Sequence, residues 1–566
     1  MKLEDQRKII VDARGRGKLA QFGAYCRLSG PGWLQSATTL GGGSLASALY
    51  LGVLGGLGFI WLQPFAMALG IIMLAGISYV TLSISQKPMA AINKNLTPIL
   101  GYGWAVGSML ACMVFAWPQF ALGVAAITQN LCHMKSAPST GVEVGVTAAL
   151  FALGLFMTAV YAVGGKGVKI FELFIKLSVA AIVVCFFGVV ISLCLGGKID
   201  WGRVAEGLVP NLSVFSSPSA DFMQYISKLD AAGQKFWSDM IVAQQIDVVI
   251  SAAAMAVGIN MTFLYPYSML KKGWDKDFRG LAIFDLATGL FIPFFLATSC
   301  IVIAASTQFH AKAAEGLAEA SIADGKLVPA VVDGRKIEPA PNLIEGYIQL
   351  LDKRAASVVG EQNYSKLAPA QKDAARNGLG IVDKQLAAML VKRDASNLAE
   401  TLEPLVGEDV ARYIFGFGVL GMAMNAVLMN MLICGLSFSE IFKRCGSAKW
   451  HICGSSLILI SAVASVFFKG ARMWLVIYAG VMAAVLLPIA YGAFIYLINS
   501  SKVLGAQRPS GGRRILWNVL MACSLLMSSI ASVWVLYQKI GLAGPALFAA
   551  FFAVVVVSAL ILKRRS

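Results

Sequence analysis

The chain has 566 residues, of which 58% are hydrophobic and only 14% are charged. Soluble domains carry about 25% charged residues, so this composition excludes an ordinary soluble domain and indicates a multi-pass membrane protein. The formal net charge of +17 is explained by basic residues that flank membrane spans on the cytoplasmic side, and we expect lipid rather than nucleic acid as a partner.

The N-terminal segment, residues 1–29, is basic and lacks the apolar core of a signal peptide, so we expect it in the cytoplasm. The first long apolar run follows and contains Thr38-Thr39-Leu40-Gly41-Gly42-Gly43-Ser44. Each glycine inside a helix costs up to ~1 kcal/mol relative to alanine. The pattern predicts a helix break whose backbone groups face a cavity. Close packing of a neighbouring helix is the alternative reason for three small residues.

Apolar runs long enough to cross a membrane recur along the rest of the chain. With the first, they predict twelve spans at about 31–54, 57–84, 103–129, 143–163, 170–196, 247–270, 280–305, 411–438, 452–469, 473–498, 515–537 and 543–562. We expect Trp117-Pro118 to interrupt span 3. The basic loops favour a topology with both termini in the cytoplasm.

The sixth span contains a second interruption, Gly258-Ile259-Asn260-Met261-Thr262, followed by Tyr265-Pro266. Spans 1 and 6 are each the first of a group of five. Paired interruptions of this kind are typical of inverted repeats, in which broken helices meet near the middle of the membrane. The ends of such half-helices carry partial charges that can bind a solute or an ion.

We expect four parts: the basic segment 1–29, spans 1–7 in residues 30–306, an extracytoplasmic helical insertion at 307–409, and spans 8–12 in residues 410–566. The insertion is the only stretch with soluble character, and residues 368–393 have helical periodicity. Packing is its default role, with a gate or a docking site for a partner as the alternative.

Short motifs distributed over spans 1 to 10 resemble the Nramp (natural resistance-associated macrophage protein) metal transporters, a branch of the LeuT-like fold. They are Gly30-Pro31-Gly32-Trp33-Leu34, Gly167-x-Lys169-x-x-Glu172, Tyr265-x-x-Ser268, Gly421-x-x-x-Asn425 and Leu487-Pro488. The resemblance implies an all-α membrane protein with a LeuT-like 5+5 inverted repeat, discontinuous spans 1 and 6, and two further C-terminal spans.

The resemblance also implies where a site would lie. In the family, span 1 breaks at Asp-Pro-Gly-Asn and span 6 at Met-Pro-His, and these motifs supply metal ligands. The corresponding positions here are 41–44 and 260–262, while the acidic proton-path residues of span 3 fall on Cys112, Gln119 and Leu122. The usual carboxylate, thioether, histidine and acidic relay are therefore replaced. A shift of one residue would put Met261 on the methionine position.

The candidate substrate-binding residues are neutral, and they gather around the two breaks. They are Thr38, Thr39, Gly41, Gly42, Gly43, Ser44, Gln119, Gly258, Asn260, Met261 and Thr262. A divalent cation at this depth requires anionic ligands or many oxygen ligands. Asp247 and Asp285 are expected at the start of span 6 and the inner end of span 7, in structural roles. We assign no metal-ligand set.

The favoured function is a secondary transporter in the cell membrane that moves a small solute or an ion. A divalent metal follows from the resemblance, and a small polar organic solute follows from the neutral site. A non-transporting sensor or assembly protein is the remaining alternative. No nucleophile–base pair stands out, so we expect neither an enzyme nor a cofactor. The oligomeric state is left open.

Overall fold

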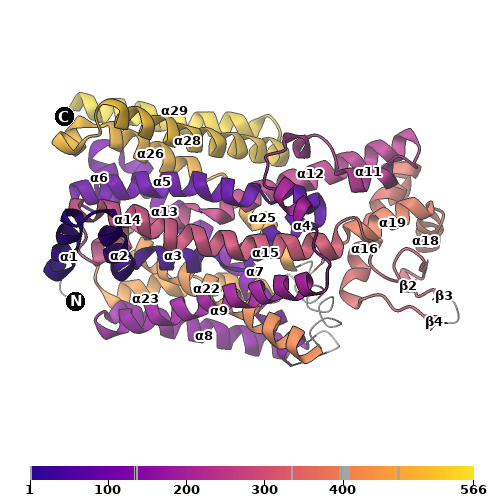
Figure 1. Cartoon of the computed structure of the whole chain (residues 1–566). Helices are drawn as coiled ribbons and strands as arrows, with labels where there is room; N and C mark the ends of the chain where they lie inside the picture. The colour runs from indigo at the N-terminus through magenta and orange to yellow at the C-terminus, as the bar shows by residue number, and fades with distance from the viewer. Residues whose placement is uncertain are drawn as a thin grey trace.

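The computed structural model describes residues 3–565 except 133, 135–137, 333–334, 394–396, 398–407 and 468–471. Within this part of the chain, twelve helical stretches are long and apolar enough to cross a membrane. Figure 1 shows them side by side in one bundle.

The first seven spans are formed by α3 (Pro31–Thr39) with α4 (Gly42–Gly55), α5 (Leu62–Ile84), α7 (Pro98–Ala125) with a π-helical extension (Ala126–Leu131), α8 (Thr140–Val163), α9 (Lys166–Leu195), α12 (Ala231–Ala256) with α13 (Ile259–Lys271), and α14 (Arg279–Leu286) with α15 (Ile292–Phe309). The last five are formed by α22 (Glu408–Ile441), α23 (Ala448–Ser456) with α24 (Leu459–Phe467), α25 (Arg472–Ala484) with α26 (Leu487–Asn499), α28 (Gly511–Ile540) and α29 (Ala543–Arg565).

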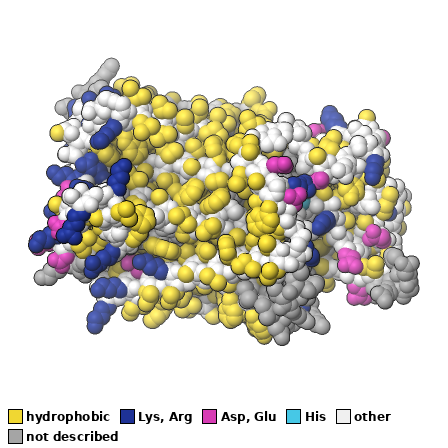
Figure 2. All heavy atoms as spheres, in the orientation of Figure 1, with side chains coloured by type: hydrophobic (Ala, Val, Ile, Leu, Met, Phe, Trp, Pro, Cys, Tyr) yellow, Lys and Arg dark blue, Asp and Glu magenta, His cyan; other side chains and the backbone are white. Residues whose placement is uncertain are grey.

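The surface of the bundle matches a lipid environment. Hydrophobic side chains cover its middle, whereas Lys and Arg side chains gather at the end that carries α1 (Leu3–Gly15) and α2 (Lys18–Leu28) (Figures 1 and 2). Large apolar side chains such as Leu526, Ile530 and Val554 are more than half exposed. A soluble protein rarely exposes so large an apolar area, so the chain is a multi-pass membrane protein.

Spans 1 and 6 are both discontinuous, as the sequence predicts. Two non-helical residues, Leu40 and Gly41, separate α3 from α4. Two extended residues, Val257 and Gly258, separate α12 from α13. The breaks therefore produce four half-helix ends in the interior of the bundle. This is the arrangement of the LeuT-like inverted repeat.

The glycine run both forms part of the helix break and allows close helix packing, which are the two roles that the sequence leaves open. Only Gly41 lies in the break, because Gly42 and Gly43 already belong to the first turn of α4. A Cβ atom on Gly41 would lie 2.7 Å from the Cβ atom of Ala426. Added Cβ atoms on Gly42 and Gly43 would collide with Gln119 and with Met255, respectively. The run thus allows three neighbouring helices to approach the break.

Two expectations about span boundaries are wrong. The helix α7 continues through Pro118 rather than stopping at Trp117-Pro118. A membrane helix tolerates a proline, which leaves only the Val114 carbonyl, four residues earlier, without its donor in the helix. The adjacent Met113 carbonyl accepts from the Ser461 hydroxyl of α24 at 2.7 Å, which fastens this part of α7 to its neighbour. Span 6 already begins at Ala231, so Asp247 lies within α12 rather than at its start.

Short helices connect the spans. They are α6 (Pro88–Asn95), α10 (Trp201–Glu206), α11 (Ala220–Ile226) and α27 (Ser501–Leu504), with 3₁₀ turns at Gly56–Phe59, Leu212–Phe215, Lys276–Phe278 and Gly505–Gln507 and a π-helical turn at Ala287–Phe291 in span 7.

Within its described residues, the stretch predicted as an insertion contains four helices and two small hairpins. The helices are α16 (Pro341–Val359), α17 (Glu361–Ser365), α18 (Pro369–Asn377) and α19 (Ile381–Leu390). Strands β1 (Ser321–Ala323) and β2 (Lys326–Val328) pair antiparallel, as do β3 (Val331–Val332) and β4 (Arg335–Lys336). The turn Asp324-Gly325 has positive φ at both residues, which is a hairpin signal visible in the sequence. Part of the C-terminal end of this stretch, 398–407, lies outside the described residues.

Candidate functional site

A small cavity lies between the two breaks. Its volume is about 30 Å³, which is close to the volume of one water molecule. The predicted residues that line it are Thr38, Thr39, Gly41, Gly43, Gln119, Gly258, Asn260 and Met261. The remaining predicted residues, Gly42, Ser44 and Thr262, do not line it. The lining also contains residues that we did not predict, namely Phe115, Ala254, Met255, Ala426 and Asn430.

Thr39 connects the two breaks directly. It is the last residue of α3, and its hydroxyl donates to the Ala256 carbonyl at 3.0 Å, at the C-terminal end of α12. The same hydroxyl lies 3.1 Å from the sulfur of Met261 in α13. The end of one broken span is thus hydrogen-bonded to both halves of the other.

The amide groups in the cavity bind each other and the backbone. Asn260 donates from Nδ2 to Oδ1 of Asn430 at 3.1 Å, and its own Oδ1 accepts from the Met261 N–H at 2.9 Å. Oε1 of Gln119 accepts from the Gly42 N–H at 3.0 Å, at the N-terminal end of α4. These bonds hold the carboxamide groups in defined orientations at two half-helix starts.

The three predicted residues outside the lining support the breaks. The Ser44 hydroxyl donates to the Thr39 carbonyl at 2.5 Å, so it closes the kink of span 1. The Thr262 hydroxyl donates to the Ile259 carbonyl and accepts from the indole of Trp104 at 2.9 Å. The backbone N–H of Gly42 is the donor to Gln119. These groups shape the cavity without being exposed to it.

The chemical character of the cavity is neutral. Its side chains supply carboxamide, hydroxyl and thioether groups, with the two sulfurs coming from Met255 and Met261. Among the described residues, no group of three or more His, Cys, Asp or Glu side chains could hold a metal ion. Any cation bound here would be coordinated by uncharged oxygen and sulfur atoms.

The α22 helix contributes an amide that sequence analysis missed. Asn430 lies in the same apolar helix as the motif residue Asn425, five residues further on. The sequence did contain a signal for Asn430, because a polar amide inside an apolar membrane span is itself a candidate binding residue. Asn425 itself is fully buried and has no hydrogen-bond partner within the described residues.

Asp285 holds the N-terminal end of span 1. Its carboxylate accepts hydrogen bonds from the backbone N–H groups of Gly30 at 2.9 Å and Gly32 at 2.5 Å, and from the Ser29 hydroxyl. It is fully buried and does not line the central cavity. A carboxylate at a helix N-terminus stabilises that end of the helix, so Asp285 positions α3.

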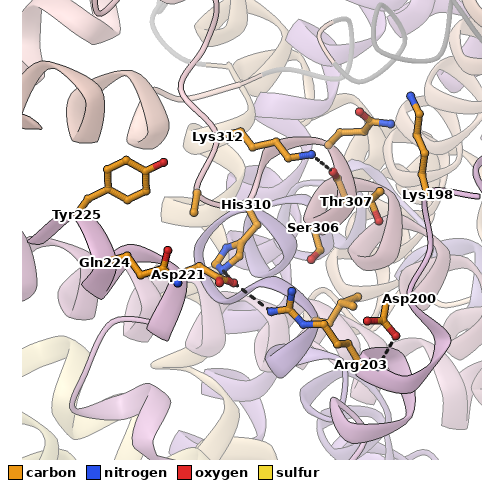
Figure 3. A pocket seen from close by; sticks show the side chains of 13 residues that line it. Lys198, Asp200, Arg203, Asp221, Gln224, Tyr225, Ser306, Thr307, His310 and Lys312 are labelled. Atoms are coloured by element: carbon orange, nitrogen blue, oxygen red, sulfur yellow. Dashed lines mark hydrogen bonds and ion pairs between the residues drawn. The ribbon is translucent and has the colours of Figure 1, made fainter.

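A second, larger cavity of about 630 Å³ is lined by the side chains drawn in Figure 3. The helix α11, which contributes to its lining, lies at the opposite end of the bundle from α1 (Figure 1). His310 follows α15 there, and its Nδ1 lies 2.9 Å from the Val53 carbonyl of α4. Its Nε2 lies 3.3 Å from the Asp221 carboxylate, which Arg203 contacts at 3.1 Å. Burial lowers the pKa of His310 below its ordinary value of 6.5, although the Val53 carbonyl and Asp221 oppose this shift.

Cations also gather on the far side of this cavity. Burial lowers the pKa of Lys312, and the nearby charges of Lys198 and Arg393 lower it further. Burial also lowers the pKa of Arg393 to about 10, although Tyr50 opposes this shift. The cavity is therefore lined by the ion pairs of Asp221 on one side and by two cations, Lys198 and Lys312, on the other.

The insertion is fastened to one half of each broken span, α4 and α12. The Asp383 carboxylate accepts from the indole of Trp237 in α12 at 2.7 Å and from Arg354 at 2.8 Å. The Tyr50 hydroxyl of α4 donates to the Arg393 carbonyl at 3.1 Å. We refer to the contacts of Trp237, Arg354, Asp383, Tyr50 and Arg393 as the outer clamp.

Comparison with known proteins supports the fold. The family model described as Natural resistance-associated macrophage protein-like matches residues 384–538, and no curated protein matches the chain. A mutant of the Eremococcus coleocola manganese transporter has a TM-score of 0.60, 13% sequence identity and 96% coverage of both chains. The same transporter in complex with an aromatic bis-isothiourea compound has a TM-score of 0.59, 13% identity, and coverage of 96% and 95%. The chain therefore has the LeuT-like fold of these transporters, and its residues 384–538 resemble the Nramp-like family.

Proposed function

We propose that the chain is a secondary transporter that carries a metal cation through the cavity between the two broken spans. The observation that carries this proposal is the meeting of Thr39, Asn260 and Met261 at the ends of half-helices. Half-helix ends at this depth are typical ion and solute sites of transporters. The similar solved structures are of a manganese transporter, which favours a metal as the cargo.

The size of the cavity favours an ion over an organic solute. A volume of about 30 Å³ holds one water or a largely dehydrated ion, whereas pockets for drug-sized organic ligands are on the order of 300 Å³ or more. An amino acid would need a substantially larger space. The polar organic solute that the sequence also allows is therefore the less favoured cargo.

The neutral ligands affect which cation is bound. Without a carboxylate, attraction to a hard divalent ion such as magnesium is weak, because that ion prefers anionic oxygen. The sulfurs of Met255 and Met261 favour softer transition metals. We therefore propose a site that prefers a softer metal to magnesium and binds manganese less tightly than a carboxylate-bearing site would.

Uptake into proteoliposomes tests the proposal. The reconstituted protein would be offered manganese, magnesium and amino acids, with Asn260→Ala and Ser44→Ala as variants. Asn95→Ala is the matched control, because Asn95 lies in α6 outside the cavity. We expect metal uptake that falls about tenfold in Asn260→Ala, corresponding to ~1.4 kcal/mol, and remains unchanged in the control. Manganese transport at a rate unaffected by Asn260→Ala would contradict the assigned site.

A second candidate function is a membrane sensor or assembly protein that moves no solute. The observation that favours it is the mutual pairing of Asn260 with Asn430, and of Gln119 with the Gly42 N–H, which leaves few polar atoms free for a ligand. If no solute moves and none raises the unfolding temperature, the transporter proposal fails and this candidate replaces it.

A further inference from the structure

A basic cavity lies between the ends of several spans, at the end of the bundle where Lys and Arg gather (Figure 2). Its volume is about 720 Å³. Five cations line it and a single carboxylate, that of Asp277, faces them. The cations are Arg14, Lys276, Arg279, Arg508 and Arg513. They come from α1, the 3₁₀ turn before α14, α14 itself, the segment before α28 and the first turn of α28.

The cations of the basic cavity are not neutralised by the protein. The Asp277 carboxylate lies 3.5 Å from Arg7, outside the lining, and Arg14 binds the Asp277 backbone carbonyl at 2.7 Å. Within the described residues, none of the five lining cations forms an ion pair. The cavity therefore has a strong positive potential that an anionic ligand would compensate.

Arg279 is already held in position. Its guanidinium donates to the Ser83 hydroxyl at 3.2 Å, to the Gln507 side chain at 2.6 Å and to the Lys276 carbonyl at 3.0 Å. It also lies 4.7 Å from the centre of the Tyr79 ring. All these partners are uncharged, so they fix the guanidinium without neutralising it. An ordered but unpaired guanidinium suits bidentate binding of a phosphate group.

The surroundings of the basic cavity indicate how such a phosphate arrives. Trp517 of α28 lines the cavity, and Trp and Tyr are enriched where a membrane meets water. The adjacent Ile515 and Leu516 of α28 are 66% and 58% exposed, so an apolar surface continues from the cavity towards the middle of the membrane. A lipid could lay its chains on this surface with its headgroup among the cations.

We propose that the basic cavity binds the phosphate headgroup of an anionic phospholipid. A basic pocket between spans attracts such headgroups, and each nearby Lys or Arg contributes on the order of 1 kcal/mol. Binding would connect α1 to the ends of spans 2, 7 and 11, because the headgroup contacts residues of all four.

The experiment uses the full chain in detergent, with a short-chain phosphatidylglycerol as the probe. Phosphatidylcholine, inorganic phosphate and glycerol phosphate form the other arms. The test variant is the double substitution Arg508→Gln and Arg513→Gln, chosen because no hydrogen bond of either side chain stabilises the fold in the described structure. The control is Arg444→Gln with Lys449→Gln, which removes the same charge from the α22–α23 connection outside the cavity.

We expect phosphatidylglycerol to raise the unfolding temperature of the wild type and the control, and to bind the test variant roughly tenfold or more weakly. Phosphatidylcholine should have no such effect. Equal phosphatidylglycerol affinity in wild type and test variant would overturn the proposal. Stabilisation by inorganic phosphate or glycerol phosphate as strong as that by the lipid would also overturn it, because the cavity would then take a free phosphate.

Discussion

Single side chains at the breaks show how much a sequence can reveal about a site. Eight of the predicted residues line the central cavity, because glycine runs and isolated polar residues in apolar spans mark interrupted helices. Met255 and Asn430 were missed, since each lies inside a regular helix and only packing brings it to the break. Gly42 was predicted as a lining residue, but its Cα atom packs against Gln119 and Leu122 instead.

His310 gives a prediction about acidity. In the unfolded chain, His310 takes up a proton near its ordinary pKa of 6.5. In the folded protein its pKa is lower, because burial disfavours the charged form. The stability that the neutral form contributes is complete above pH 6.5 and is lost as pH falls from 6.5 towards the folded-state pKa. Each unit by which folding lowers the pKa of His310 corresponds to ~1.4 kcal/mol of unfolding free energy lost at low pH. Asp221 and Arg203 are the charged groups that face His310.

The variant His310→Gln should therefore lose less stability than the wild type on acidification from about pH 7.5 to about pH 5.5. Unfolding temperatures at the two pH values give the measurement. Gln224→Ala is the control, because Gln224 lines the same cavity without a titratable group. An identical pH slope in His310→Gln and wild type would show that His310 does not cause the effect.

At the scale of elements, the sequence located helices better than it located their ends. Apolar runs predict twelve spans, and glycine and proline residues predict the two discontinuous ones. Pro118 was misleading because a lipid-embedded helix can pass through a proline, which leaves only one carbonyl, that of Val114, without its donor in the helix. The polar first half of α12 was also misleading, since Trp237 and Gln245 are buried against other parts of the protein rather than facing lipid.

The outer clamp gives a prediction at this scale. Asp383→Asn keeps the shape of the side chain but removes the charge. Among the described residues, the buried Arg354 then keeps Asp230, at 3.6 Å, as its one carboxylate partner. Removing one partner of a buried ion pair typically costs ~3–5 kcal/mol. We expect a lower unfolding temperature and faster proteolysis between α16 and α19. Glu361→Gln, an exposed site with the same change of charge, should leave both measurements unchanged.

The whole molecule is asymmetric in charge along the bundle. Lys and Arg dominate the end with α1 and α2, whereas the end with the insertion carries both signs (Figure 2). The end of α29 lies with α1 at the basic end (Figure 1). By the positive-inside bias, the basic end should face the cytoplasm. Charge patterns thus predict orientation from sequence, whereas the cargo depends on a few contacts that only folding reveals.

Labelling with a membrane-impermeant maleimide tests this orientation in intact cells. In a background whose exposed cysteines are replaced by serine, Glu361→Cys of α17 should react from outside. Lys18→Cys of α2 should react only after the membrane is permeabilised, and serves as the paired control. Labelling of Lys18→Cys in intact cells, with Glu361→Cys protected, would invert the proposed topology.

The cap that Asp285 forms has a mechanical consequence. Because the Asp285 carboxylate of α14 accepts hydrogen bonds from two backbone N–H groups at the start of α3, α3 and α14 are held together as one unit. A Cβ atom on Gly32 would collide with the Asp285 backbone, so the two helices are in direct contact. We therefore expect bending at Leu40-Gly41 and at the π-helical turn Ala287–Phe291, where the two spans depart from regular α-helix. If the protein alternates between two open states, α3 should swing together with α14 about these two hinges.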